Sequence, residues 1–381
     1  MRWLRSALAP LRRFGAAQCG AGLLAAPPAL LVLGSLVAGA VATWRALRRK
    51  LDDAVCGEPD DSVCGDAEWT TRRGEARGAE FAQRVLAGLF EPMATQVGGM
   101  QHMDGKRGMM SLRNAEVEKP TALLAEGRVP LLKAMQSRLR GVREVSFYEG
   151  MSFDDARWAG RAKGADFDKR FGGLRPFICG YHGVVKLAES DCRDQGSYII
   201  LDDCTAGMTK PAVLDVKMGT TTIEPSGVSE ERRRRELQKY PEQRVHGMRV
   251  VGMRCWRRRS RAWDVHDKAW GLSLRTHAQL QAGFGLFFGA DRDELRARRP
   301  LIAEFERRCR CLLEWFEVSN RELNFFSSSL LFVYDAADPG NAKLEFRMID
   351  FTHVRREGVA DDGYIHGLRR LVDILAALQR D

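Results

Sequence analysis

Apolar and polar positions follow regular spacings from about residue 80 to the end of the chain, and these spacings predict both strands and helices. Short apolar or alternating runs are typical of strands. The predicted strands lie at 128–135, 175–185, 198–203, 211–218, 247–253, 328–335 and 346–354. A hairpin is predicted at 96–112, with its turn at Asp104 and Gly105. Segments with a helical period begin near Arg143 and cover 229–240, 301–317 and 363–379.

The order of these elements indicates an α+β protein with two lobes. The first half is rich in strands, whereas the second half mixes strands with long helices. Such an arrangement favours two packed units with a cleft between them. We expect the first lobe to span about 80–203 and the second lobe about 204–381.

One predicted strand carries charges among apolar residues. Residues 211–219 read PAVLDVKMG, in which Asp215 and Lys217 are two positions apart. Because side chains alternate across a strand, Val213, Asp215 and Lys217 share one face, and the apolar residues between them share the other. Gly219 would end the strand and allow a turn or a close approach to a ligand. Two interpretations are open here: an ion pair on an exposed sheet, or two functional groups that face a cleft.

Composition adds a preference for anionic partners. The chain has 381 residues, a net charge of +10 and a pI of about 9.3. Such a basic excess suits nucleic acid, anionic lipid or a phosphorylated small molecule. The nine cysteines include no CxxC pair, which argues against a zinc site.

The first fifty residues differ from the rest of the chain. No acidic residue precedes Asp52, and no charge occurs between Phe14 and Trp44. We interpret 1–50 as a membrane anchor or a cleaved targeting segment, with a disordered tail as the third interpretation. The polar, Gly-rich stretch at 51–79 is predicted to be a linker. Membrane association through the N-terminus is one expectation, and the localisation is left open between membrane, organelle, cytoplasm and nucleus.

Three charged residues in separate elements match the needs of phosphoryl transfer. Lys133 lies in a predicted strand, Glu144 follows on a helix, and Asp350 ends an apolar strand just before Phe351. In phosphoryl transfer a lysine holds nucleotide phosphates, a glutamate orients that lysine, and an aspartate binds magnesium. The chain has no P-loop motif, which excludes that class, and the lack of an H-R-D motif argues against an ordinary protein kinase.

Three short motifs resemble the signatures of the inositol polyphosphate kinase family. PAVLDVKMG fits the pattern PxxxDxKxG, SSLLFVYD resembles the SSLL element, and MIDFTHV resembles the IDF element. The resemblance covers about 85–379 and is closest to the multikinases, with the hexakisphosphate kinases as the near rival. It implies a kinase domain at 80–381 with a two-lobed, kinase-like α+β fold, antiparallel sheets and an active-site cleft. It also implies ATP-dependent phosphorylation of soluble inositol polyphosphates with ATP and Mg²⁺ as cofactors.

The resemblance implies a role for each matching residue. Lys217 and Asp350 would be catalytic, and Asp350 would bind the metal ion. The residues implied in nucleotide binding are Lys133, Glu144, Asp202, Cys204, Asp215 and Ser329. Those implied in substrate binding are Arg140, Lys217, Arg232, Arg235, Lys239, Lys268 and His353.

Within the nucleotide site, the resemblance implies a separate partner for each group. Lys133 would bind ATP phosphates, Asp202 and Cys204 would offer backbone groups to adenine, and Asp215 would bind the ribose hydroxyls. Lys217 would contact the substrate beside the transferred group. The two charges in PAVLDVKMG would therefore mark the place where the nucleotide and the inositol phosphate meet.

The helix predicted at 229–240 supports an anionic substrate independently of the resemblance. Ser229 is a suitable N-cap. Arg232, Arg235 and Lys239 are spaced by three and four, so they share one face of the helix. Cations that repel one another favour an anion opposite, and arginine forks match phosphate oxygens. A solvated run of charges is the other interpretation.

Other classes of protein are alternatives to a multikinase. They are a hexakisphosphate kinase that makes pyrophosphates, a membrane-tethered non-catalytic binder of inositol phosphates or phosphoinositides, and a basic nucleic-acid-binding protein. The acids at Asp215 and Asp350 argue against the last class, so no nucleic acid is expected, and we expect a monomer. The basic stretch CWRRRSRAW at 255–263 is predicted to be a loop that is solvated or contacts anionic lipid.

Overall fold

The computed structural model describes residues 90–93, 96, 109–112, 129–136, 139–153, 168–186, 197–338 and 343–380. All of them belong to one unit, Glu80–Asp381. The N-terminal segment at 1–50 and the linker at 51–79 lie outside the described residues, so both stay predictions. Within the part of the chain that is described, no helix is long and apolar enough to span a membrane.

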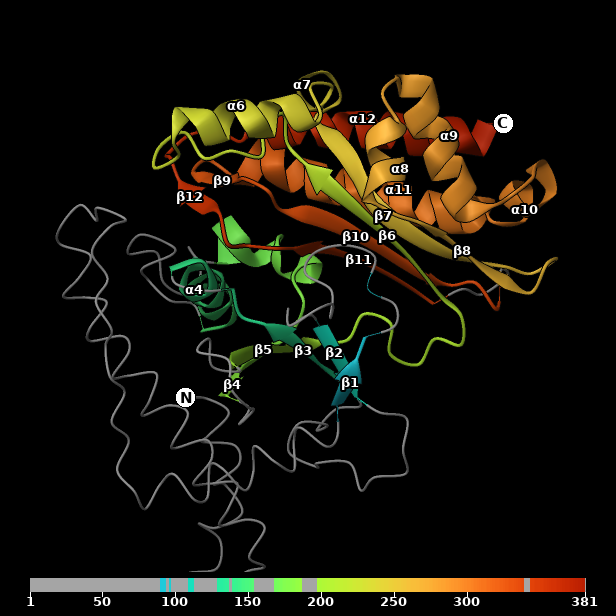
Figure 1. Cartoon of the computed structure of the whole chain (residues 1–381), viewed down its shortest axis with the longest axis horizontal. Helices are drawn as coiled ribbons and strands as arrows, with labels where there is room; N and C mark the ends of the chain where they lie inside the picture. The colour runs from blue at the N-terminus through green and yellow to red at the C-terminus, as the bar shows by residue number, and fades with distance from the viewer. Residues whose placement is uncertain are drawn as a thin grey trace, which may run out of the picture. The chain divides into compact units, whose positions relative to one another are not determined.

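The first half of the described chain forms an antiparallel sheet of five strands, in the order β1-β2-β3-β5-β4 (Figure 1). The strands are β1 (Phe90–Pro92), β2 (Met109–Leu112), β3 (Pro130–Ala134), β4 (Tyr181–Lys186) and β5 (Ser197–Asp202). Branched apolar residues such as Leu132 and Ile199 are buried where β3 pairs with β5. Helix α4 (Leu139–Phe153) follows β3 and contacts β4.

The second half forms another antiparallel sheet of five strands, in the order β11-β10-β6-β7-β8. These strands are β6 (Pro211–Met218), β7 (Met248–Arg257), β8 (Ala262–His266), β10 (Ser329–Asp335) and β11 (Leu344–Ile349). A small separate sheet pairs β9 (Leu323–Phe325) with β12 (Val354–Arg356). The stretch PAVLDVKM therefore occupies the central strand, β6, and Gly219 ends it with a φ of +91°, as the sequence predicts.

Helices cover one face of the second sheet (Figure 1). The longer helices are α6 (Glu230–Lys239), α9 (His277–Phe288), α11 (Arg299–Glu314) and α12 (Asp362–Arg380), and the shorter ones are α7 (Gln243–His246), α8 (Lys268–Ser273) and α10 (Arg292–Ala297). Three one-turn or two-turn pieces lie at Asp168–Gly172, Arg175–Phe177 and Trp315–Ser319. Leu214, Val216 and Met218 of β6 are fully buried on the helix-covered face. Each such side chain contributes about 1.5 to 3 kcal/mol of hydrophobic free energy.

The structure corrects three sequence predictions. Strand β2 pairs with β1 at Phe90–Pro92, which precedes the hairpin predicted at 96–112. The predicted turn at Asp104 and Gly105 lies outside the described residues. The strand predicted from Arg175 begins only at Tyr181, because Arg175–Phe177 is a short 3-10 helix with a proline in its first turn. The loop predicted at 255–263 is a hairpin instead, since β7 and β8 pair across it and the rings of Trp256 and Trp263 lie 5.3 Å apart.

Gly247 provides a test of the packing that holds α7 against α12. Its φ is +66°, and an added Cβ would lie 2.6 Å from the backbone nitrogen of Gly367. We expect Gly247→Ala to lower the free energy of unfolding by about 1 to 2 kcal/mol for the left-handed backbone and by roughly 1 to 3 kcal/mol more for overpacking. Urea denaturation measures this loss.

Gly227→Ala is the matched control for this change. Gly227 has a φ of +73°, but a Cβ there would meet no atom within 4 Å. Only the backbone contribution should therefore be lost. Equal destabilisation in the two variants would contradict the close approach of Gly247 to α12.

Candidate active site

Lys133 connects the two sheets through a pair of carboxylates. From β3 its ammonium donates to Oε1 of Glu144 at 2.6 Å and to Oδ1 of Asp350 at 2.5 Å. Glu144 lies on α4 and is fully buried, and Asp350 directly follows β11. Burial acts to lower the pKa of Lys133, but the two carboxylates outweigh it and raise the pKa well above its ordinary value. Lys133 is therefore a permanent cation held at a fixed position.

The backbone at Asp350 turns the carboxylate into the site. Asp350 has a φ of +66°, which is rare for a residue other than glycine. Such a conformation costs of order 1 to 3 kcal/mol and persists only where the surroundings hold it. Phe351 supplies that hold, because its ring stacks on Phe147 of α4 at 4.1 Å. Burial acts to raise the pKa of Asp350, but the ammonium groups of Lys133 and Lys217 outweigh it and lower the pKa.

A cavity of about 70 Å³ lies where Lys133 meets the second sheet. Five of the residues predicted for nucleotide or metal binding line it: Lys133, Asp202, Cys204, Asp215 and Asp350. The opposing walls are apolar and are formed by Leu131, Leu201, Val213, Leu331 and Ile349. Apolar walls together with a few charged groups suit an apolar ring joined to phosphates. Sequence analysis missed these apolar residues because each belongs to a run that is typical of any buried strand.

Asp215 faces this cavity from β6, as the alternation along PAVLDVKM predicts. Its side chain is buried, and Oδ1 has no hydrogen-bond partner among the described residues. Burial and the charge of Asp350 raise the pKa of Asp215 to about 6, although Lys217 opposes the shift. A buried acceptor without a donor is costly, and the two hydroxyls of a ribose would supply donors at this place.

Lys217 lies two residues further along the same face. Its Nζ donates to the carbonyl oxygen of Ser327 at 2.9 Å. Burial lowers its pKa, the carboxylates of Asp350 and Asp215 oppose the shift, and the cations Arg249 and Lys268 add to it. Ser329 stands opposite Lys217 on β10 and is fully buried.

The segment after β5 offers backbone groups at the edge of the cavity. The N–H of Asp202 donates to Gly180 O at 2.9 Å, and its carboxylate bonds to His182 at 2.7 Å. The N–H of Cys204 makes no bond within the described parts of the chain, so it is available to a bound molecule. The Cys204 thiol lies 3.5 Å from the thiol of Cys179.

The basic helix forms as predicted, but its cations are partly paired. The hydroxyl of Ser229 accepts from the backbone of Arg232 at 3.3 Å and caps α6. Arg232, Arg235 and Lys239 are all exposed. Lys239 is paired with Glu236, and Arg235 lies 3.7 Å from Glu231. Acids therefore alternate with the bases on this helix, which reduces the repulsion inferred from the sequence.

Arg249 is a candidate residue that sequence analysis missed. It stands opposite Lys217 on β7, so the two cations share one face of the sheet. A bulge between Asp215 and Val216 shifts the pairing by one residue and brings Arg249 to this place. Arg249 is 8% exposed and lines a second cavity, of about 120 Å³, beside α6. An arginine inside the apolar run GMRVVGM is the signal that could have revealed it.

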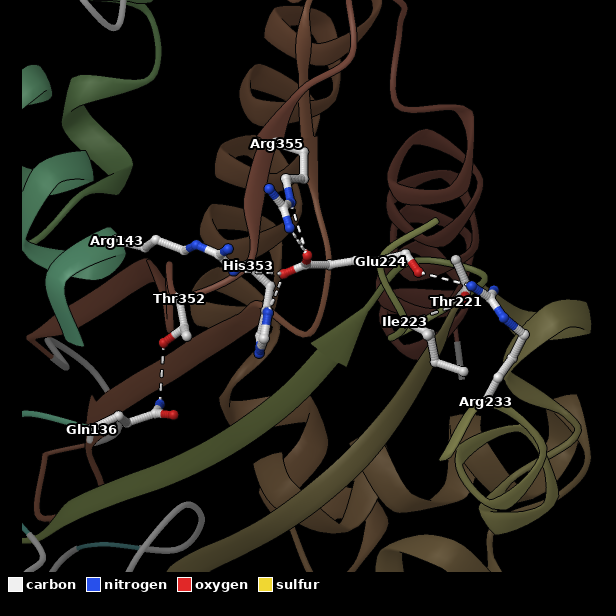
Figure 2. Close-up of polar contacts among 9 residues, drawn as sticks. All are labelled: Gln136, Arg143, Thr221, Ile223, Glu224, Arg233, Thr352, His353 and Arg355. Carbon is white, nitrogen blue, oxygen red and sulfur yellow. Dashed lines mark hydrogen bonds and ion pairs between the residues drawn. The ribbon is translucent and has the colours of Figure 1, made fainter. Parts of the chain in front are cut away.

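The other predicted substrate residues lie apart from the first cavity. Arg140 is exposed at the start of α4 and lines neither cavity. Lys268 is the exposed first residue of α8, and its charge acts on Lys217. His353 precedes β12 and bonds through Nδ1 to the buried carboxylate of Glu224 (Figure 2).

The donor set for a metal ion is small. The described residues contain no group of three or more His, Cys, Asp or Glu side chains that could hold a metal. Among the carboxylates that line the first cavity, Asp350 is the one that bonds to Lys133. Mg²⁺ is typically held by one or two carboxylates together with water and substrate phosphates, and one aspartate beside a lysine fits that mode.

Comparison with known proteins identifies the family. Residues 198–376 match the family model of the inositol polyphosphate kinases. The chain is 30% identical over 294 residues to the inositol polyphosphate multikinase of Homo sapiens, which covers 76% of this chain and 62% of that protein. It is 29% identical over 207 residues to inositol hexakisphosphate kinase 3 of Mus musculus, covering 48% and 51% of the two chains. Residues 198–376 of the chain therefore belong to the inositol polyphosphate kinase family.

The solved structures that match are more distant. The crystal structure of the inositol phosphate multikinase Ipk2 of S. cerevisiae, in complex with ADP and Mn²⁺, is 21% identical with a TM-score of 0.49. It covers 65% of this chain and 98% of that chain. This chain spans less than two thirds of the length of its human multikinase relative.

The raised pKa of Asp215 allows a test of whether its carboxylate binds a nucleotide. An ionised carboxylate accepts hydrogen bonds more strongly than a protonated one. We expect the affinity for ADP to fall as the pH drops from about 8 to about 5, through the Asp215 pKa of about 6. In Asp215→Asn this part of the pH dependence should be absent.

Calorimetric titration of both proteins over this range measures the effect. The ratio of the two dissociation constants cancels the titration of the phosphates of ADP itself. The wild-type advantage should reach about tenfold or more above the pKa, as expected for a charge-assisted hydrogen bond, and should disappear below it. A ratio that does not change with pH would show that Asp215 does not bind the nucleotide.

Proposed function

We propose that the protein transfers the γ-phosphate of ATP to a hydroxyl of a soluble inositol polyphosphate, in the manner of the multikinases. The observation that carries this proposal is the position of Lys133, which is locked between Glu144 and Asp350 at the end of a cavity that Asp215 also lines. Phosphoryl transfer depends on such positioning and on charge stabilisation more than on covalent chemistry of the protein. Membership of the family supports the same reaction.

Each charged group of the cavity has a separate role in this proposal. Lys133 binds the ATP phosphates, and Glu144 holds its ammonium in place. Asp215 accepts the ribose hydroxyls, and the N–H of Cys204 donates to adenine. Lys217 stands beside the transferred group and contacts the acceptor. Its pKa, which burial lowers, makes its proton more available than that of an exposed lysine.

Asp350 would hold Mg²⁺ when the ion is bound. The fit rests on a carboxylate that lines the cavity, whose pKa lies below its ordinary value and which is therefore ionised at neutral pH. The ion would supply charge neutralisation between the phosphates. Lys133 already shares the same carboxylate, so the lysine and the metal site are positioned by one group.

The acceptor is proposed to bind on the side of the cavity where cations gather. Arg249 and Lys268 both act on Lys217 there, so cations from three elements meet. Arg249 also lines the second cavity, to which α6 contributes Glu236 and Leu237. A molecule with several phosphates offers an anion to each of these groups. A non-catalytic binder would need no carboxylate beside the phosphates, so Asp350 and Asp215 argue for turnover.

Loss of the metal carboxylate should stop the reaction. We expect Asp350→Asn to lower kcat by at least about a hundredfold, because a neutral amide cannot offset the charge of a divalent ion. The measurement is the formation of ADP and phosphorylated product from ATP, Mg²⁺ and a panel of inositol phosphates. The exposed Asp373 of α12 provides a matched control, and Asp373→Asn should turn over at the wild-type rate.

Two results would count against this proposal. If the wild type phosphorylates no inositol phosphate in the panel, the proposed activity is wrong. If the wild type is active and Asp350→Asn keeps more than about a tenth of its kcat, the activity stands but Asp350 is not the metal ligand.

Arg249 offers a test of the acceptor site. We expect Arg249→Met to lower kcat/KM for an inositol phosphate by about tenfold to a hundredfold, as expected for loss of one charge-assisted contact, with the KM for ATP unchanged. The effect should shrink as salt rises, because ions screen the wild-type contact. Arg259→Met, in the exposed turn between β7 and β8, is the matched control.

A stability measurement separates binding from structure at this position. No hydrogen bond or ion pair of Arg249 occurs within the described residues. Burial lowers the pKa of Arg249, and the charges of Glu236 and Asp215 only partly offset it. A buried cation that makes no hydrogen bond or ion pair does not stabilise a fold, so Arg249→Met should not reduce the melting temperature of the free protein. A marked fall in melting temperature together with an unchanged KM would assign Arg249 a structural role instead.

A further inference from the structure

The loop between β6 and α6 buries one carboxylate that belongs to no motif. Glu224 is 5% exposed. Its Oε1 accepts from Nδ1 of His353, its Oε2 accepts from Nε of Arg355 at 2.8 Å, and Nη1 of Arg143 lies 3.6 Å from Oε1 (Figure 2). Burial acts to raise the pKa of Glu224, but the hydrogen bonds from His353 and Arg355 outweigh it and hold the pKa at about 2. Glu224 is therefore an anion throughout the neutral range.

The position of this carboxylate is fixed through its own backbone. Arg233 of α6 donates to the carbonyl oxygen of Glu224 at 3.2 Å and to that of Pro225 at 3.0 Å. Just before it, the hydroxyl of Thr221 accepts from the N–H of Ile223 at 3.2 Å. The loop is thus tied both to α6 and to itself. The side chains that bond to the Glu224 carboxylate, His353 and Arg355, are therefore also fixed in position relative to α6.

The contact determines the state of the His353 ring. An ionised carboxylate can only accept hydrogen bonds, so Nδ1 of His353 must carry a proton. The other nitrogen, Nε2, points away from Glu224 (Figure 2) and bonds to none of the described residues. His353 follows Asp350 by three residues. Its carbonyl oxygen accepts from the N–H of Phe326 at 3.1 Å, and the next residue, Ser327, accepts through its carbonyl oxygen from Lys217 at 2.9 Å. The ring therefore belongs to the same part of the fold as Asp350 and Lys217.

We propose that Glu224 is a positioning residue for the acceptor site. Its carboxylate fixes the tautomer and the direction of the His353 ring, so that Nε2 is presented to the acceptor. It is also a shared counter-ion of Arg355 and Arg143. The identity of the acceptor as an inositol polyphosphate rests on the proposed function, but the state of the ring does not.

A neighbouring carboxylate supplies a matched control. Glu322 accepts from Nε of Arg356 at 2.6 Å and lies 3.2 Å from Nη1 of Arg170. Like Glu224 it is a largely buried partner of two arginines, and Arg355 and Arg356 are adjacent residues of β12. Glu322 contacts no histidine in the described structure. Glu322→Gln therefore removes the same charge from the same small sheet without touching the His353 ring.

The first experiment determines which nitrogen of the His353 ring carries the proton. Nitrogen-15 NMR of the full chain, labelled at histidine and assigned with His353→Ala, distinguishes a proton on Nδ1 from one on Nε2. We expect the wild-type ring, and that of Glu322→Gln, to carry the proton on Nδ1. In Glu224→Gln the amide can turn its NH₂ group toward the ring, so we expect a mixture of tautomers. A wild-type neutral ring with its proton on Nε2 would overturn the proposal without any variant.

The second experiment is a double-mutant cycle in the kinase reaction. We expect Glu224→Gln to lower kcat/KM for the inositol phosphate by about tenfold or more, with the KM for ATP changed by less than about twofold. In a His353→Ala background the same substitution should cost less than about twofold, because its effect passes through the ring. Glu322→Gln should leave both parameters near their wild-type values.

The outcomes separate this proposal from the proposed function. If the wild type phosphorylates no inositol phosphate, the proposed function fails, and the NMR result alone then decides the state of the ring. If the wild type is active but Glu224→Gln costs equally in both backgrounds, or weakens ATP as much as the acceptor, Glu224 is a structural residue and the proposal fails. Wild-type kinetics in Glu224→Gln would overturn it as well.

Discussion

The ammonium of Lys133 is shared by two carboxylates that come from separate elements, one on α4 and one at the end of β11. Taking three charges out of water is expensive, and such a group is stable only when its members are fully paired. The set carries one more negative than positive charge, and Oε2 of Glu144 has no partner among the described residues. The spacing of the two sheets at this point is thus set by an ion network that suits a further cation.

Strand β6 places one acidic and one basic side chain next to this ion network. Its position between β10 and β7 buries Leu214, Val216 and Met218 against the helices. The alternate residues Asp215 and Lys217 are then forced toward the cavity side, since side chains on a strand alternate. The bulge in the pairing with β7 adds Arg249 next to Lys217. The central strand β6 therefore has a carboxylate at Asp215 and, two residues further on, cations at Lys217 and the neighbouring Arg249.

Much of this arrangement could be predicted from the sequence, because short motifs carry both the charge and the strand period. The alternation in PAVLDVKMG was enough to place Asp215 on the cavity side, and Ser229 was enough to begin α6. Arg249 and Glu224 could not be found in the same way. The first depends on a bulge between two strands, and the second depends on a loop that folds back on β12. Neither event leaves a local pattern in the chain.

Two elements of the second half of the chain were also not predicted from the sequence. The helix α9 was not predicted, because its glycines and aromatic residues hide the helical period, and only the capping box of Thr276 and Gln279 marks its start. The hairpin of β7 and β8 was taken for a loop because its basic residues are typical of solvated turns. Its pairing is stabilised by contacts that cross between strands, such as Arg254 over the Trp263 ring at 3.7 Å.

Helix α4 provides a physical connection between the two sides of the site. Arg143 and Glu144 are adjacent on it, and each meets a partner of opposite charge from another part of the fold. Glu144 bonds to Lys133 on the proposed nucleotide side, whereas Arg143 lies beside Glu224, which bonds to His353 on the proposed acceptor side. A shift of α4 by a fraction of a turn would loosen both contacts together. The proposed nucleotide and acceptor sites are therefore expected to tighten together, since one rigid helix supplies a charge to each.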